Sequence, residues 1–324
     1  MDEHEYKIGI VNGSSIYYTP AEDGIEWTTY RVGQAGELTF RIPPNETTVK
    51  ADLGNLVMFH VDSNPVFYGW IREIETDQDG GMRVRAVDQL GFLNYVERYT
   101  FKNKTADEII WIIAPDFPPL KCSPDIPSTG YRIPLQIEDG TPIFDIILNA
   151  LDTTLKETGV RYTLYDDYGK LMLASNEDMK ISNMMLTADN IETFSYSANL
   201  NDTYNVIKLV KTDTAADKNV ISMVIDSESI AKYGTMQYYE EITDADTDAE
   251  ARANLLLSIY NKPSRSLRIT APGDVRIRAG SFIPVSLKLA GILQNSFLVV
   301  DSVTHRFGTE YTMDIRFSGD GFKA

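Results

Sequence analysis

The sequence predicts a β-rich α+β multidomain protein, in which two related small β-barrel-like domains flank an α+β middle domain. Three observations lead to this fold class. The chain has 324 residues, more than one hydrophobic core usually serves. Apolar residues alternate with period two over the first quarter of the chain and again over its last third. Helical patterns with clear caps lie between these stretches.

The first domain, residues 1–98, is predicted from short alternating strands and tight turns. Asn12-Gly13 suits the two-residue turn of a hairpin. Leu-Thr-Phe-Arg-Ile at 38–42 alternates apolar and polar residues until Pro43-Pro44 stops the strand. Asp79-Gly80-Gly81 marks another turn before the last strand. Six or seven such strands predict a small barrel or sandwich.

The middle domain, residues 99–190, combines helices with a hairpin. Thr105 and Glu108 form a capping box at the start of an isoleucine-rich helix. A second helix is expected to start at Thr141-Pro142, with proline at its first position, and to end at Gly159. Asp166-Asp167-Tyr168-Gly169 then suits the turn of a hairpin.

The last domain, residues 191–324, returns to period two and is predicted to be a second β-barrel-like domain. A helical insertion is expected near 246–262, opened by a capping box from Thr247 to Glu250. Lys262-Pro263 would end this helix, after which alternating strands resume.

The first and last thirds of the chain share an order of elements. In each, a strand meets a proline, a glycine (Gly54 or Gly280) precedes the next strand, and two further strands follow. Residue identity is low, so chance similarity of two β segments is the alternative. If the resemblance is real, a cyclic trimer of such chains would present six similar surfaces.

Composition excludes several classes of protein. The 47 acidic residues outnumber the 30 basic ones, giving a net charge of −17, so we expect no specific nucleic-acid binding. No run of about 18 apolar residues is present, so no stable membrane insertion is expected. The acidic start argues against a secretory signal. A single cysteine, Cys122, fits a reducing compartment.

Paired carboxylates offer two candidate sites of chemistry. Asp166 and Asp167 could supply the acid and base of a glycoside hydrolase, but a solvated turn explains them as well. Alternate aspartates before the last helix (Asp244, Asp246 and Asp248) resemble the start of a calcium loop. That loop's glycine and glutamate are missing, and a helix dipole explains the acidic residues. We therefore expect no metal and no cofactor.

The remaining candidates suit packing better than catalysis. His305 and His60 lie in apolar strands, and Cys122 lies in a proline-rich loop without an activating base. The tryptophans could form a sugar-stacking platform, but their spacing favours the core; they are Trp27, Trp70 and Trp111. We expect no catalytic, cofactor-binding or metal residues.

Several runs of residues together resemble a known family. Two of these runs are Trp-Thr-Thr-Tyr-Arg-Val-Gly at 27–33 and Phe-Tyr-Gly-Trp-Ile at 67–71. The most specific is Tyr-Thr-Phe-Lys-Asn-Lys-Thr-Ala-Asp-Glu-Ile-Ile at 99–110, and Gly-Asp-Val-Arg-Ile-Arg-Ala-Gly at 273–280 belongs to the closing module. The chain thus resembles baseplate hub proteins of contractile phage tails and phage-tail-like bacteriocins, the late-control-D-like tail hub family.

The resemblance implies a structural role without catalysis. It implies a homotrimer whose barrel-like domains form a pseudo-sixfold ring between the tail tube protein and the central spike protein. The tape-measure protein and the baseplate wedge proteins would be further partners. The particle would assemble in the bacterial cytoplasm and hold the chain in its baseplate. The charge of −17 suggests an acidic channel.

Two other functions stay open on the residues alone. One is a phage-associated cell-wall polysaccharide hydrolase that uses Asp166 and Asp167. The other is a monomeric carbohydrate-binding protein that uses exposed aromatic residues.

Overall fold

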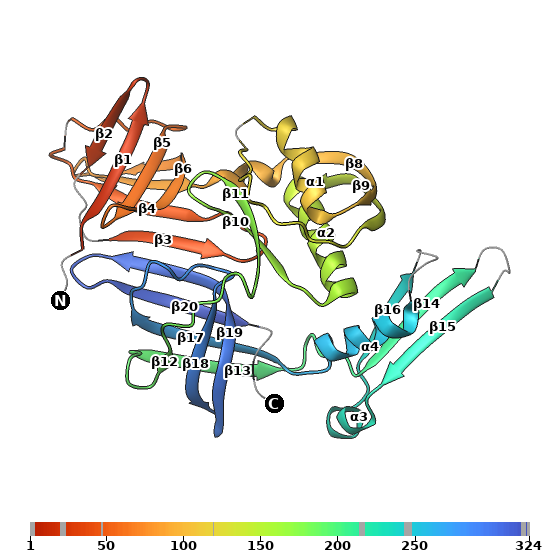
Figure 1. Ribbon diagram of the computed structural model, residues 1–324. Coiled ribbons are helices and arrows are strands. Elements are labelled where there is room, and N and C mark those ends of the chain that lie inside the picture. The colour runs from red at the N-terminus through yellow and green to blue at the C-terminus, as the bar shows by residue number, and fades with distance from the viewer. Residues whose placement is uncertain are drawn as a thin grey trace.

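The computed structural model describes residues 4–19, 24–46, 48–118, 120–213, 218–242, 248–318 and 322. The protein is β-rich, and its hydrophobic residues form four separate cores. Two β units lie one above the other, with a helical middle unit and a small outlying unit to one side (Figure 1).

The first β unit is built from the strands that the alternating pattern predicts. They are β1 (Tyr6–Asn12), β2 (Ser15–Thr19), β3 (Ile25–Tyr30), β4 (Glu37–Ile42), β5 (Leu56–Val61), β6 (Asn64–Thr76) and β7 (Met82–Val87). The predicted turns at Asn12-Gly13 and Asp79-Gly80-Gly81 are confirmed, since they join β1 to β2 and β6 to β7. Inward residues such as Ile8, Phe40 and Phe59 are fully buried.

The second β unit is assembled from segments that are far apart in the chain. Its strands are β12 (Leu186–Thr187), β13 (Thr193–Asn199), β17 (Ser264–Pro272), β18 (Phe282–Leu289), β19 (Ile292–Phe307) and β20 (Thr312–Ser318). Its core is distinct from that of the first unit and includes Leu267, Val285, Val303 and Phe317.

The two β units join through one pair of strands. β19 pairs antiparallel with β3, so both units share a 13-stranded sheet whose main path runs from β13 to β2. This pairing links residues about 275 positions apart in sequence, from Ile25 against Phe307 to Tyr30 against Ser302. The relative position of the units is therefore set by backbone hydrogen bonds.

The same strand order occurs in both units. The order β3-β4-β7-β6-β5 in the first matches β13-β17-β20-β19-β18 in the second, and every pairing is antiparallel. A bulge after Ile71 in β6 matches a bulge after Val300 in β19. The Gly54 amide donates to the Ile71 carbonyl at 2.9 Å, as the Gly280 amide donates to the Val300 carbonyl at 2.8 Å. The order of elements read from the sequence is therefore a repeated topology.

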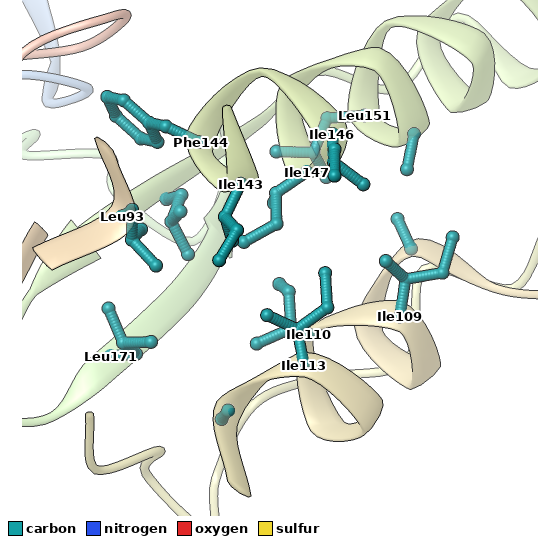
Figure 2. Close-up of a cluster of buried hydrophobic side chains, with 14 of the residues drawn as sticks. Leu93, Ile109, Ile110, Ile113, Ile143, Phe144, Ile146, Ile147, Leu151 and Leu171 are labelled. Atoms are coloured by element: carbon teal, nitrogen blue, oxygen red, sulfur yellow. The ribbon is translucent and has the colours of Figure 1, made fainter. Parts of the chain in front are cut away.

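The middle unit packs two helices together beside one hairpin and a second antiparallel pair of strands. Its elements are η1 (Gln89–Asn94), β8 (Val96–Lys104), α1 (Ala106–Ile113), η2 (Ala114–Asp116), β9 (Ile133–Pro142), α2 (Ile143–Thr158), β10 (Tyr162–Asp166) and β11 (Leu171–Ser175). The hairpin is β10–β11, and the second antiparallel pair is β8–β9. Isoleucines of α1 face those of α2 in a dry core (Figure 2). The capping box of Thr105 and Glu108 is confirmed.

Two details of the middle unit differ from the sequence prediction. Pro142 is the N-cap of α2 and not its first residue as predicted, because Pro142 still pairs with Val96 at the end of β9. The strand pair β8–β9 has no counterpart in our prediction. Apolar residues do alternate along β9, but Leu135 and Ile137 are exposed, and residues 105–132 separate the two strands, so no local turn signal indicates the pairing.

A small outlying unit lies between β13 and β17. It contains β14 (Val206–Asp213), β15 (Lys218–Ile225), α3 (Ser227–Tyr233), β16 (Gln237–Ile242) and α4 (Ala249–Tyr260). The three strands pair only with one another in the described residues, and α4 covers one face through Ala253 and Leu256. The helix expected near 246–262 is therefore α4. Its N-cap is Asp248, whose side chain accepts from the Glu250 and Ala251 amides, while Thr247 lies outside the described residues.

Candidate functional site

The joint between the two β units is reinforced by side chains on both faces of the sheet. On the open face, the Thr28 and Thr304 hydroxyls are 3.0 Å apart. Arg306 bridges Glu26, at 3.1 Å, and Asp314. These side chains come from neighbouring strands, so their cross-strand contacts stabilise the pairing of β3 with β19.

On the covered face, the joint holds a buried histidine. His305 is fully buried and stacks on Trp27, with ring centroids 5.0 Å apart. Its Nε2 donates to the Ile277 carbonyl at 2.8 Å, so its Nδ1 must accept from the Tyr311 hydroxyl at 2.8 Å. Burial lowers the pKa of His305 to about 4, which keeps the ring neutral. The predicted packing role of His305 is confirmed.

A second junction brings all three larger units together around buried carboxylates. Asp88 follows β7, Asp166 ends β10, and Arg278 lies in the loop before β18. The Asp88 carboxylate accepts from the Gly36 and Leu90 amides at 2.8 and 2.9 Å. Arg278 donates to the Asp166 carbonyl at 2.7 Å, and its guanidinium lies 4.1 Å from the centre of the Tyr165 ring.

Gln89, the first residue of η1, connects the end of β7 to the β10–β11 hairpin and to the loop at Lys121. Its side-chain amide donates to the Asp166 carboxylate, and its carbonyl oxygen accepts from the Lys121 amide at 2.9 Å. The other Asp166 oxygen accepts from the Gly169 amide at 2.9 Å. Burial raises the pKa of Asp166 to about 6, and burial beside Asp166 raises the pKa of Asp88 well above its usual range. Both carboxylates are therefore used as structural acceptors.

These observations correct the interpretation of Asp166 as a solvated turn residue. The turn is present, but Asp166 is only 6% exposed, because the first and second β units close over it. The sequence analysis did not assign a role to Gln89 or to Arg278, although Arg278 lies in the run at 273–280 that carries the family resemblance. The one available signal was a polar pair, Asp88-Gln89, directly after an alternating strand.

The hairpin turn between β10 and β11 also contacts the first β unit. The Tyr168 hydroxyl is 3.0 Å from Nε2 of His60, and the Tyr168 ring packs edge-on against Tyr68. Burial lowers the pKa of His60. The packing role predicted for His60 is confirmed.

The other predicted candidates do not gather into a reactive site. Asp248 caps α4, while Asp244 and Asp246 lie outside the described residues. Among the described residues, no group of three histidine, cysteine or acidic side chains could hold a metal ion. Burial raises the pKa of Cys122 to about 11, so its thiolate is scarce at neutral pH. No described helix has the length and apolar character needed to cross a bilayer.

The tryptophans divide between core and surface. Trp27 is 5% exposed and lies in the core. Trp70 is half-buried against Phe92 and Tyr68. Trp111 on α1 is 44% exposed, so the core prediction is wrong for this residue, because helical spacing alone does not say which of two neighbouring apolar positions faces inward.

The open face of the shared sheet carries a charge-balanced lattice. Arg85 bridges Glu37 and Glu73 at 3.1 and 2.8 Å, and Arg41 pairs with Asp77 at 2.6 Å. This face holds six arginines and six carboxylates; they are Arg41, Arg83, Arg85, Arg268, Arg306, Arg316, Glu26, Glu37, Glu73, Glu75, Asp77 and Asp314. The acidic excess of the chain therefore lies elsewhere.

This fold is that of solved phage tail proteins. A 43 kDa tail protein of prophage MuSo2 from Shewanella oneidensis superimposes with a TM-score of 0.68 at 16% identity, over 97% of this chain and 98% of that one. Prophage tail protein gp18 from Listeria monocytogenes superimposes with a TM-score of 0.65 at 12% identity, over 97% of this chain and 95% of that one. A chain of a Francisella PdpA–VgrG complex superimposes with a TM-score of 0.57 at 12% sequence identity, over 98% of this chain and 58% of that one.

The family follows from sequence relatives. The chain is 32% identical over 277 residues to the phage-like element PBSX protein XkdQ of Bacillus subtilis, covering 84% of this chain and 83% of that protein. It is also 32% identical over 268 residues to protein YqbQ of the same organism. The model of the YQBQ-like family matches residues 25–318. The chain belongs to the YQBQ-like family.

Proposed function

We propose that the protein is a structural baseplate hub of a contractile tail, of a phage or of a tail-like bacteriocin. Three chains form a ring that joins the tail tube to the central spike. The shared fold with prophage tail proteins and the similarity to a protein of a phage-like element support this role.

The repeated strand order is the observation that carries the proposal. Each chain holds two β units with the same five-strand order, joined edge to edge through β3 and β19. A threefold axis would multiply them into six similar units. Such a ring can continue a sixfold tube on one side and accept a threefold spike on the other.

In this ring, the charge-balanced face of the sheet lines the channel. The opposite face of each unit is covered by its own core and carries the middle unit at the Asp88–Asp166 junction. A wall of paired charges would be neutral overall, which replaces the acidic channel expected from the net charge. Neutral walls would let the tape-measure protein or DNA pass without strong attachment.

The role is structural, and a non-enzymatic chain fits the state of its paired aspartates. Both oxygens of Asp166 already accept hydrogen bonds from Gly169 and Gln89. The tail tube protein and the spike protein would bind the two rims of the ring, and wedge proteins would bind its outside. The chain would assemble in the cytoplasm and remain in the baseplate.

The test is the symmetry of the purified full-length chain. Light scattering should give the mass of three chains, and electron-microscopy averages should show a threefold ring with six lobes. A stable dimer, or a single chain at every concentration and with tail tube and spike proteins added, would contradict the proposal. Loss of turbidity of a cell-wall suspension that Asp167→Asn abolishes would support the hydrolase alternative instead.

A further inference from the structure

We infer that β13 of each chain pairs antiparallel with the second half of β6 in the next chain, with Ser197 opposite Glu75. This inference rests on the proposed ring and specifies its contact between chains. The occupant of the open edge of β13 is therefore a second copy of this chain.

The two β units contain equivalent strands. The repeated strand order makes β13 the counterpart of β3, and β6 the counterpart of β19. Within the chain, β3 pairs with the second half of β19, and this pairing joins the first unit to the second. The counterpart pairing, β13 with the second half of β6, does not occur within the described residues of one chain.

Both counterpart edges are open in the single chain. Among the described strands, β13 pairs only with β17, and β6 beyond Ile71 pairs only with β7. An open edge with unpaired amides and carbonyls is a template for another strand. The chain thus carries two complementary open edges, one on each unit.

Exposure of side chains supports the same conclusion. Ile25 and Trp27, on the core side of β3, are 1% and 5% exposed because the joint covers them. By the register on the adjacent strands, their counterparts on β13 are Phe194 and Tyr196, and Phe194 is 46% exposed. A large aromatic residue on the core side of an edge strand is what a missing neighbour would leave uncovered.

The register of the contact follows from the matched bulges. Because Ile71 matches Val300, Glu73 and Glu75 match Ser302 and Thr304. Within the chain, Thr304 lies opposite Thr28, and Thr28 matches Ser197. Glu75 of one chain therefore lies opposite Ser197 of the next, and Glu73 lies opposite Asn199.

Charge is complementary at this contact. The β6 edge presents Glu73 and Glu75, while Arg268 on β17, next to β13, and Arg316 on β20, one strand further, lie on the same face. Small residues on β13, including Ser195 and Ser197, leave room for the arginines to reach across. The contact joins different surfaces of the two chains, and such a contact closes a ring of three chains when each chain is rotated by one third of a turn from the last.

Cysteine cross-linking tests the register directly. The variant Glu75→Cys/Ser197→Cys is made in full-length chain that also carries Cys122→Ser, and is oxidised mildly before a non-reducing gel. Directly opposite residues have Cα atoms within the range that a disulfide spans. The positive control is Thr28→Cys/Thr304→Cys, the counterpart pair inside one chain. The oxidant should take two protons and two electrons from this pair, so that the intact mass falls by two hydrogen atoms and no larger species forms.

The matched off-register control is Glu75→Cys/Ser195→Cys. Ser195 lies on the same face of β13 but two residues away, about 7 Å along the strand. We expect the Ser197 variant to form covalent species of up to three chains, and the Ser195 variant to form at least tenfold less.

The outcomes separate this inference from the proposed function. Particles with the mass of three chains, combined with no Ser197 cross-link or with equal cross-linking of both variants, would overturn the β13–β6 contact and leave the hub proposal standing. A single chain in scattering, together with no cross-link at any concentration tested, would overturn both.

Discussion

The two matched glycines of the repeat allow a sharp test of how the middle unit is held. Gly54 and Gly280 both have left-handed backbones, with φ of 84° and 90°. A Cβ at position 54 would meet nothing within 4 Å. A Cβ at position 280 would lie 2.8 Å from Thr163 Cγ2 and from Met179 Sδ, both from outside the second β unit's repeated strands.

The magnitudes follow from these distances. Gly54→Ala carries only the strain of a left-handed alanine, about 1–2 kcal/mol. Gly280→Ala carries the same strain and also forces a methyl group against Thr163, which is 1% exposed and has little space in which to move. Overpacking of this kind costs about 1–3 kcal/mol. We therefore expect Gly280→Ala to lower the free energy of unfolding by about 2–5 kcal/mol.

Urea unfolding followed by circular dichroism measures the difference. The midpoint of Gly280→Ala should lie well below that of Gly54→Ala, with similar slopes. Adding Thr163→Ala to Gly280→Ala should recover part of the loss, since it removes the contacting methyl group and the Thr163 hydroxyl has no hydrogen-bond partner. Equal losses for the two glycine variants would refute the argument.

Three further predictions concern the buried polar groups, each measured by urea unfolding as a function of pH. Because the pKa of Asp166 is raised to about 6, its contribution to the free energy of unfolding is most favourable at low pH and falls by about 3 kcal/mol as the pH rises from 4 to 6. Asp166→Asn should remove this fall, and an unchanged pH dependence would contradict the assignment. The pKa of His305 is lowered to about 4, so its effect on stability runs in the opposite direction. The free energy of unfolding should fall by about 3 kcal/mol as the pH falls from 6.5 to 4, and His305→Gln should lose this pH dependence. Arg278→Met leaves two buried carboxylates without their cation, so it should lose about 3 kcal/mol at pH 7 and less at pH 4, where protonation removes the charge; a loss that does not depend on pH would indicate a packing effect instead.

Much of the local structure could be predicted because its signals lie within a few residues. The turn at Asn12-Gly13, the capping box at Thr105 and the left-handed end of α2 at Gly159 each depend on neighbours in sequence. The strands of both β units follow from alternation, since one face of each meets a core. Prediction failed for the antiparallel pair β8–β9, because residues 105–132 separate the two strands and the alternating residues Leu135 and Ile137 are exposed.

The candidate site could not be predicted in the same way. Asp166 looked like an ordinary turn residue because its surroundings come from elsewhere in the chain. Gln89 lies 77 positions away, and Arg278 lies 112 positions away. No pattern within the hairpin reports that two β units close over it, so its burial and raised pKa appear only in the folded chain.

The sequence by itself determined most of the strands and helices and their order, because hydrophobic periodicity, turn residues and caps act over one or two turns of chain, and it left the repetition of that order as one of two interpretations. Only the tertiary structure decided that β3 pairs with β19 and that Asp88, Asp166 and Arg278 meet. The physical reason is that any exposed strand edge can accept a partner, and the choice among partners depends on the packing of whole units.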